Sequence, residues 1–164
     1  MPHVLLIGNG AREHAIAEAI ARSSGRPRLF AFMKANNPGI AALAEKIQLG
    51  SYADLAAITG FAKDHQIDFA VIGPEDPLGN GVVDALAEIG IGAVGPNKSL
   101  ARLETSKAFT RNLVSKYQIP GNPQFKVFTS LDGIETFLNE LEGIVLKPDG
   151  LTGGKGVLVQ GDHF

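Results

Sequence analysis

Short apolar segments alternate with segments of helical pattern in the first part of the chain, and this alternation constrains the fold more than any other feature. Four apolar segments are predicted to be strands: 4–7, 28–33, 68–73 and 92–95. Three segments with apolar residues at helical spacing are predicted to be helices: 11–23, 52–65 and 82–89. Continuously apolar strands are typical of sheets covered on both faces, and helical crossovers join parallel strands. The pattern therefore predicts an α/β fold built on a parallel sheet.

The pattern changes after residue 100. A long polar helix is predicted over 100–118, with an interruption near 104–107, and "QIPGNP" (118–123) then breaks the chain. Beyond the break we expect a strand, a helix and two further strands, at 125–128, 131–141, 143–147 and 156–159. The break favours a domain boundary close to it, and the ending "GDHF", directly after a strand, is typical of a truncation inside a larger fold.

The composition excludes several classes of function. The 164 residues include no cysteine, which excludes a disulfide framework, a thiolate zinc site and a cysteine nucleophile. A formal net charge of −2 without a basic run argues against a nucleic-acid binder. No apolar run approaches the ~18 residues of a membrane span, and the apolar start is too short for a signal peptide. We therefore expect a soluble cytoplasmic protein that binds neither nucleic acid nor membranes.

The first strand ends in "GNG", residues 8–10, directly before the first helix. A glycine turn at this place presents backbone N–H groups to an anion at the helix N-terminus. The dinucleotide fingerprint needs a third glycine and an acid after the second strand, but Glu13 replaces the glycine and no acid follows the strand. This argues against NAD, while Lys34 keeps an NADP site open and a turn without ligand is a further alternative. Arg12 is a suitable phosphate partner, whereas His14 either packs locally or touches ligand.

Two further loops are expected at the same edge of the sheet. In "GPEDPL", Gly73 allows close backbone approach, and Pro74 and Pro77 stiffen the turn. Glu75 is a candidate acceptor for sugar hydroxyls or an amine, with a solvated acid in a rigid turn as the alternative. "NNPG" (36–39) would add asparagine amides as donors.

The stretch "IVLKPDGLTGGKGVLV", residues 144–159, is the most specific local signal. A strand that is expected to be buried ends at Lys147, and a loop with four glycines and Lys155 follows before the next strand. Backbone donors and lysines on such a flap suit the phosphates of a nucleoside triphosphate. The spacing is not that of a Walker A loop, and a strand rather than a helix follows it. A long hairpin turn is the alternative here, and a solvated helix lysine is the alternative for Lys107.

Six motifs taken together resemble one family. They are "IGNGAREHAIA", "NNPG", "GPEDPL", "VGPNK", "ETSKAFTR" and "VLKPDGLTGGKGV". Their order and spacing are similar to those of the glycinamide ribonucleotide synthetase (phosphoribosylamine–glycine ligase) family, within the ATP-grasp superfamily. The match covers essentially the whole chain but only the amino-terminal part of that family's enzymes. The resemblance implies a Rossmann-like parallel-sheet pre-ATP-grasp domain over 1–103 and the beginning of an ATP-grasp domain over 104–164. Asp76 stands where alanine is commoner, a change expected to be tolerated at the surface.

The resemblance also implies which residues bind which ligand. Phosphoribosylamine would lie against the first and third loops, at Gly8, Asn9, Gly10, Arg12, Glu13, Gly73, Pro74 and Glu75. ATP would lie against the lysines and the glycine-rich flap, at Lys107, Lys147, Asp149, Gly150, Gly153, Gly154, Lys155 and Gly156. No catalytic residue and no metal ligand are assigned within the chain, and the ligands of Mg²⁺ are expected beyond Phe164.

The implied reaction is the ATP-dependent joining of glycine to phosphoribosylamine, which gives glycinamide ribonucleotide in de novo purine biosynthesis. ATP would phosphorylate the glycine carboxylate, and the amine of phosphoribosylamine would attack the acyl phosphate. Such chemistry depends mainly on positioning and on charge neutralisation by lysines and Mg²⁺. The chain is expected to be inactive alone. Two alternatives stay open: another ATP-grasp ligase that joins a different carboxylate to an amine, and a non-catalytic module that binds a sugar phosphate or a nucleotide.

Overall fold

The computed structural model describes residues 1–153 and 155–164. The chain divides into two compact units, Met1–Ala101 and Arg102–Phe164, and the two are described separately below. In the described part of the chain, no helix combines the length and the apolar character that a membrane span requires.

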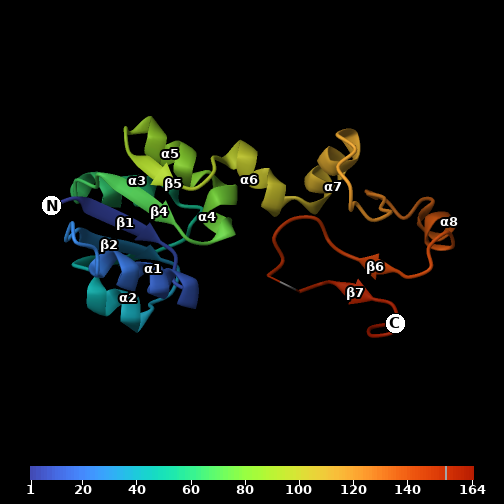
Figure 1. The fold of residues 1–164 in the computed structure, drawn as a ribbon, viewed down its shortest axis with the longest axis horizontal. Coiled ribbons are helices and arrows are strands. Elements are labelled where there is room, and N and C mark those ends of the chain that lie inside the picture. The colour runs from blue at the N-terminus through green and yellow to red at the C-terminus, as the bar shows by residue number, and fades with distance from the viewer. Residues whose placement is uncertain (154) are drawn as a thin grey trace. The chain divides into compact units, whose positions relative to one another are not determined.

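The first unit is built on a five-stranded parallel sheet (Figure 1). Its strands are β1 (His3–Ile7), β2 (Arg28–Met33), β3 (Lys46–Leu49), β4 (Phe69–Ile72) and β5 (Gly92–Val94). They lie in the order β3-β2-β1-β4-β5, and every pair of neighbours is parallel. The chain therefore adds strands on one side of β1 and then crosses to the other side at β4. The parallel α/β fold expected from the sequence is confirmed.

Helices cover both faces of this sheet, because successive side chains of a strand point to opposite faces. Leu6 of β1 packs in a cluster with Ala17 and Ile40, which come from α1 (Ala11–Ala21) and α2 (Pro38–Leu43). Leu5 and Ile7 belong to the opposite cluster, which includes residues of α3 (Leu55–Asp64) and α5 (Val82–Glu88). Figure 1 shows these two helical layers on either side of the sheet. The central strand is thereby buried on both faces, as its unbroken apolar sequence predicts.

Three elements of this unit were not expected from the sequence. The helices α2 and α4 (Glu75–Asn80) lie in segments that were expected to be loops, because asparagine, proline and glycine dominate them. Both begin at positions where these residues are tolerated: Asn37 caps α2 with Pro38 in its first turn, and Pro74 precedes α4. The strand β3 lies at an edge and is largely exposed, so it lacks the apolar run by which the other strands are recognised.

The second unit contains short elements and has little interior. Its helices are α7 (Lys107–Lys116) and α8 (Ile134–Leu138), and α6 (Lys98–Thr105) contains the division between the units. The antiparallel pair β6 (Val145–Leu146) and β7 (Leu158–Val159) forms its sheet. No described residue after Ala101 is buried.

Several sequence-based expectations for the second unit are wrong. The strand before Lys147 was expected to be buried, but Val145 is 51% exposed, because no second layer covers the two-stranded sheet within the described residues. The segment 125–128 does not form the expected strand. The break at 118–123 lies inside the second unit, whereas the first compact unit ends at Ala101, next to the division between 103 and 104 that the resemblance implies.

Candidate functional site

Two glycine loops meet where the strand order reverses. The N–H of Gly8, just after β1, donates to the Phe32 carbonyl at 3.1 Å, and the N–H of Gly73, just after β4, donates to the Ile7 carbonyl at 2.9 Å. Both loops therefore continue the hydrogen-bond ladder beyond the ends of their strands. The carboxyl ends of strands beside such a reversal are where parallel α/β sheets bind ligands.

Glu13 lies beneath these loops and is 3% exposed. Its Oε2 accepts from the Gly10 N–H at 2.7 Å, and its Oε1 accepts from Arg12 Nε at 2.9 Å. The neighbouring glycines leave the space that it fills: a Cβ would lie 2.4 Å from its Cγ at Gly8 and 2.2 Å at Gly73. Glu13 thus takes the place of a third glycine because its side chain anchors the loop. Its burial leaves little of its side chain exposed at this edge of the sheet.

Arg12 connects the two loops through its guanidinium group, which binds both Glu13 and Glu75. Besides its bond to Glu13, its Nη1 and Nη2 lie 3.2 and 3.3 Å from Oε1 of Glu75. The hydrogen bonds to Glu13 and then to Glu75 raise the pKa of Arg12 above its usual range. A hydrogen bond from its own backbone N–H, followed by the Arg12 guanidinium, lowers the pKa of Glu75. The arrangement is a fixed cation with a carboxylate beside it, and the Arg12 side chain is 57% exposed.

A third loop supports the glycine turn. Asn37 Nδ2 donates to the carbonyls of Asn9 and Gly10 at 3.1 and 3.3 Å, while its Oδ1 caps α2. Tyr52 donates from its hydroxyl to Asn9 Oδ1 at 2.6 Å. The "NNPG" loop was expected at this edge with its asparagine amides as donors, and Asn37 does donate here, to the glycine turn; Tyr52 was not singled out. The asparagine before proline was a usable signal for a helix cap, whereas no local pattern marks Tyr52.

The N–H groups available to an anion differ from those expected. Those of Gly8 and Gly10 are already engaged with the Phe32 carbonyl and the Glu13 carboxylate. Within the described chain, the N–H groups of Asn9, Ala11 and Arg12 have no acceptor, since the first turn of a helix lacks internal partners. The N–H groups that are free to bind an anion therefore lie next to Gly8 and Gly10, mainly at the start of α1, and not on the two glycines themselves.

The remaining polar residues at this edge contact neighbouring side chains. Lys34 Nζ lies 3.6 Å from Asp76 Oδ2, and the Asp76 side chain is 52% exposed, which agrees with its expected place at the surface. His14 packs against the first turn of α2, because a Cβ at Gly39 would lie 2.2 Å from its ring. Its Nε2 is 3.7 Å from Glu18 Oε1, so the ring packs locally.

In the second unit, the segment 149–150 binds the start of α7. Asp149 Oδ2 accepts from the Ser106 hydroxyl at 3.0 Å, and its Oδ1 accepts from the Ala108 N–H at 3.1 Å. The Ala108 bond is the main reason that the pKa of Asp149 is lowered. Lys107 Nζ donates to the Gly150 carbonyl at 2.5 Å. Ser106 caps α7 in turn, which explains the interruption of the long polar helix near 104–107.

The glycine-rich flap has an open backbone. Gly150 and Gly153 have φ angles of 90° and 58°, and a Cβ at either would meet nothing within 4 Å. Lys147 is exposed directly after β6, and the N–H of Lys155 closes a turn to the Thr152 carbonyl. Lysines beside open backbone groups are a donor set that fits phosphate oxygens.

Gly154 was expected to contact ATP, but it lies outside the described residues. The described residues include no cluster of three acidic or histidine side chains that could hold a metal ion.

Family models match both parts of the chain. The N domain of phosphoribosylglycinamide synthetase matches residues 2–104. The ATP-grasp (A) domain of phosphoribosylglycinamide synthetase matches residues 105–163.

Curated relatives are similar over nearly the whole chain. A phosphoribosylamine–glycine ligase of Methanococcoides burtonii is 51% identical over 162 residues, which cover 99% of this chain and 38% of the relative. The ligase of Methanocaldococcus jannaschii is 52% identical over 166 residues, covering 98% of this chain and 37% of the relative. The chain thus spans less than two fifths of the length of these relatives.

Solved structures share the architecture. N5-carboxyaminoimidazole ribonucleotide synthetase from Thermotoga maritima has a TM-score of 0.70 at 18% identity, over 97% of this chain and 40% of that one. Phosphoribosylglycinamide synthetase from Anaerococcus prevotii has a TM-score of 0.65 at 17% identity, over 96% and 38%. Such low identities show the fold alone, whereas the two family models account for nearly every residue. The chain therefore belongs to the phosphoribosylglycinamide synthetase family.

Proposed function

We propose that the enzyme containing this chain joins glycine to phosphoribosylamine, with ATP as phosphoryl donor, and releases glycinamide ribonucleotide for purine biosynthesis. Membership of the family and the names of the relatives support this proposal. The single observation that carries it in the structure is the Arg12–Glu75 pair beside the open first turn of α1. A phosphate needs the cation and the free N–H groups, and an amine needs the carboxylate.

The first unit would hold the phosphoribosyl group. The N–H groups of Ala11 and Arg12 and the Arg12 guanidinium would bind the phosphate, since charged donors at a helix N-terminus suit an anion. Glu75, whose lowered pKa keeps it ionised, would accept from the ribose or the amine. Glu13 would act beneath the loop by positioning Arg12. The remaining proposed contacts are with backbone at Gly8, Asn9, Gly10, Gly73 and Pro74.

The second unit would hold part of the ATP. Lys147 and Lys155, with the open backbone at Gly150 and Gly153 and the backbone of Gly156 beside Pro148, would neutralise and bind the phosphates. Lys107 and Asp149 would act by holding the flap against α7, because both already bind across that contact. When bound, ATP supplies the phosphoryl group that activates a carboxylate. We assign no ligand of Mg²⁺ to this chain.

Ribose 5-phosphate tests the phosphoribosyl site, because it carries the sugar and phosphate without the amine. In an NMR titration of the chain, we expect the largest shifts at residues 9–12 and 73–75. Arg12→Met should weaken binding roughly 10- to 100-fold, as expected for the loss of charge-assisted hydrogen bonds. Arg22→Met, at the other end of α1, is the matched control and should change nothing.

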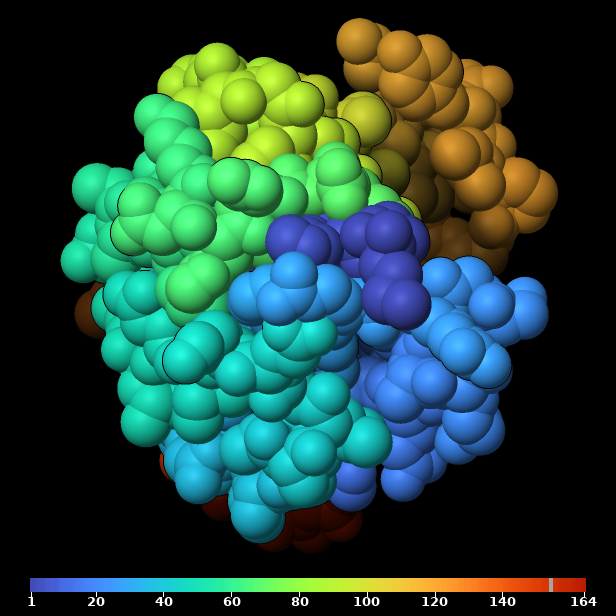
Figure 2. All heavy atoms as spheres, turned by 90° about the vertical axis from the view of Figure 1, so that its left-hand side faces the viewer, coloured from blue at the N-terminus to red at the C-terminus, as the bar shows by residue number. Residues whose placement is uncertain are grey.

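Binding of ribose 5-phosphate at the opposite edge of the sheet, where the strands begin, would contradict this assignment. A hollow of about 220 Å³ lies there, lined by residues that include His3, Arg28, Glu45 and His65. Figure 2 shows this face, with the start of the chain between the segments that lead into β2 and β4. Arg28 is paired with Glu45 at 2.7 Å. If the largest chemical-shift changes in the titration were centred on this hollow, the phosphate would bind there and the proposed site would be wrong.

Lys147 tests the nucleotide site in the enzyme that contains this chain. We expect Lys147→Ala to lower kcat/KM for ATP roughly 10-fold or more, because a phosphate would lose a charged donor. Lys98→Ala is the control, since Lys98 begins α6 and is assigned no ligand. Equal kinetic losses from both substitutions would show that the nucleotide lies elsewhere.

A further inference from the structure

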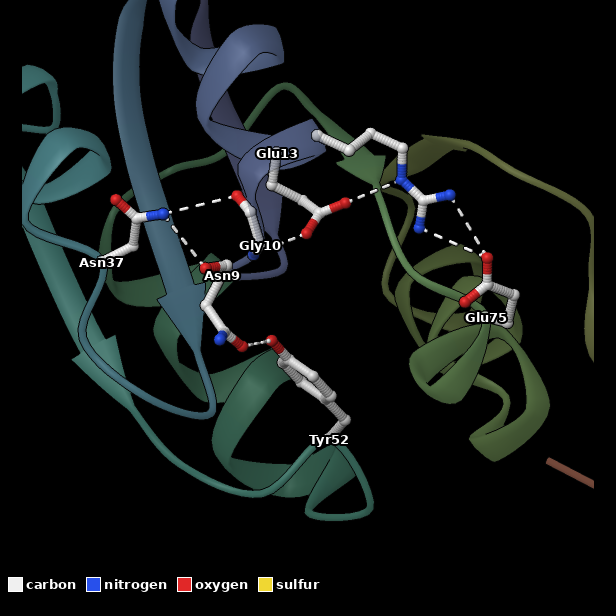
Figure 3. Close-up of polar contacts among 7 residues, drawn as sticks. Asn9, Gly10, Glu13, Asn37, Tyr52 and Glu75 are labelled. Atoms are coloured by element: carbon white, nitrogen blue, oxygen red, sulfur yellow. Dashed lines mark hydrogen bonds and ion pairs between the residues drawn. The ribbon is translucent and has the colours of Figure 1, made fainter. Parts of the chain in front are cut away.

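Tyr52 reaches the glycine loop from the core of the first unit. It is 4% exposed and belongs to the cluster that contains Phe32 and Ile58. Only its hydroxyl meets polar groups: the oxygen lies 2.6 Å from Asn9 Oδ1 and 3.3 Å from the backbone nitrogen of Lys34. Figure 3 shows the phenol ending at the Asn9 side chain. The contact joins positions 43 residues apart in the chain.

The direction of each hydrogen bond follows from the groups involved. A backbone N–H can only donate, so the phenol oxygen accepts from Lys34 and its own proton is left for Asn9. The 2.6 Å distance is typical of O–H···O and short for N–H···O. Burial raises the pKa of the Tyr52 phenol, so this proton is retained at neutral pH. The Asn9 oxygen therefore faces Tyr52, and its Nδ2 faces the other way.

The backbone of Asn9 is held as well. Asn37 Nδ2 donates to the Asn9 carbonyl at 3.1 Å, so rotation of the side-chain amide is the main freedom left to this residue. In the described chain, Asn9 Nδ2 has no acceptor. In the sequence, Asn9 precedes the first turn of α1, where the N–H groups of Ala11 and Arg12 are also free. An amide turned by 180° would instead direct its oxygen away from Tyr52 and its Nδ2 toward it.

We propose that Tyr52 is a positioning residue for the phosphoribosyl ligand, and that it acts by orienting the Asn9 amide so that two N–H donors face the ligand's oxygens. The inference rests on the proposed function, which assigns a phosphoribosyl group to this loop. Tyr52 touches no ligand in this arrangement. The Asn9 amide could direct either its oxygen or its nitrogen toward the ligand. The Tyr52 hydroxyl binds the oxygen and so leaves the nitrogen as the donor to the anion.

The binding experiment uses the whole chain and ribose 5-phosphate. Tyr52→Phe should weaken binding by roughly 3- to 10-fold, the range expected for one hydrogen bond that is no longer oriented. Tyr117→Phe is the matched control, since Tyr117 is the other tyrosine of the sequence and is 63% exposed. Unchanged affinity in Tyr52→Phe, with or without a lower Tm, would overturn the proposal.

A double-mutant cycle separates action through Asn9 from a general effect on the fold. In an Asn9→Ala background, Tyr52→Phe should cause no further loss of affinity. Asn9→Asp keeps an acceptor for Tyr52 but presents an oxygen to the phosphate, so it should bind more weakly than Asn9→Ala. A loss from Tyr52→Phe that is equally large in the Asn9→Ala background contradicts action through Asn9.

The amide orientation is measurable without ligand, which distinguishes this inference from the proposed function. In NMR spectra of the free chain, the Asn9 Nδ2 protons should show at most a weak nuclear Overhauser effect to the Tyr52 ring, because the amide oxygen lies between them. A strong effect would mean that the amide is reversed, and it would overturn the inference. Absence of any ribose 5-phosphate binding to the unmodified chain would instead count against the proposed function and against the ligand role of Tyr52, while the orientation stands on the NMR result.

Discussion

At the scale of single residues, the loop depends on a buried acid surrounded by glycines. Glu13 occupies the space beside Gly8 and Gly73, and both glycines approach it more closely than a Cβ would allow. The carboxylate is satisfied by the Gly10 N–H and by Arg12, so its burial carries no unpaired charge. Packing and electrostatics therefore act on the same side chain.

Adding one methyl group at this point tests the packing. A Cβ at Gly73 would lie 2.2 Å from Glu13 Cγ, so Gly73→Ala should lower the free energy of unfolding by about 1–3 kcal/mol or more. Gly60→Ala is the control, because Gly60 lies within α3 and has nothing within 4 Å of the added atom. It should raise stability by about 0.5–1 kcal/mol. Urea denaturation measures the free energy of unfolding of both variants. If Gly73→Ala were as stable as the unmodified chain, Glu13 would not be packed against Gly73.

At the scale of elements, helix ends hold the loops that would bind ligands. The start of α1 is tied down by Glu13, and the start of α7 is tied down by Asp149. In α7 the carboxylate accepts from the Ser106 hydroxyl and the Ala108 N–H. Asp149 lies at the start of the flap, and α7 begins at Lys107. One carboxylate therefore connects the two proposed ATP-binding segments of the second unit.

The Asp149 contact makes the start of α7 sensitive to acid. Its pKa is lowered from the ordinary value of 3.8, so its contribution is fully present above pH 3.8 and is lost as the pH falls through the lower folded value. At pH 6, Asp149→Asn should speed amide exchange in the first turn of α7 by roughly 3- to 10-fold. This difference should vanish at pH values where Asp149 is itself protonated. Asp162→Asn, in the exposed carboxyl-terminal turn, is the control and should have no effect on this exchange. Unchanged amide exchange in Asp149→Asn at pH 6 would contradict a stabilising contact between Asp149 and the start of α7.

At the scale of the whole molecule, the buried apolar residues are unevenly distributed. All of them lie between Val4 and Ala101 among the described residues, and all but these two belong to two clusters, one on each face of the parallel sheet. The second unit exposes side chains such as Val145 and Leu158, which are 51% and 43% exposed. Since apolar burial is the main favourable term in folding, the first unit carries most of the stability.

Hydrogen exchange measures this difference directly on the intact chain. Amides of β1 and β4 should exchange only through global unfolding, because both strands are central and well covered. Amides of β6 and β7 should exchange at least about 100-fold faster, through local opening of an uncovered pair. The two pairs serve as controls for each other within one experiment. Equal protection of β1 and β6 would show that the second unit has a core of its own.

The sequence by itself determined the central strands, the parallel α/β class and the edge at which the loops gather. Unbroken apolar runs such as 4–7 and 29–33 are expected to be buried on both faces, and glycine directly after β1 and β4 marks the edge at which the loops gather. These signals are local, so no tertiary information is needed to interpret them. The motifs of the second unit identified the flap for the same reason.

Only the tertiary structure decided which groups at that edge are free to act. The motif shows that Glu13 replaces a glycine, but only the tertiary structure shows that it is buried between the two glycine loops and that the Gly8 and Gly10 N–H groups are engaged. The bonds of Tyr52 to Asn9 and of Arg12 to Glu75 join positions 43 and 63 residues apart. Periodicity and motif spacing describe neighbours along the chain, whereas contacts at such separations exist only after the sheet has brought its loops together.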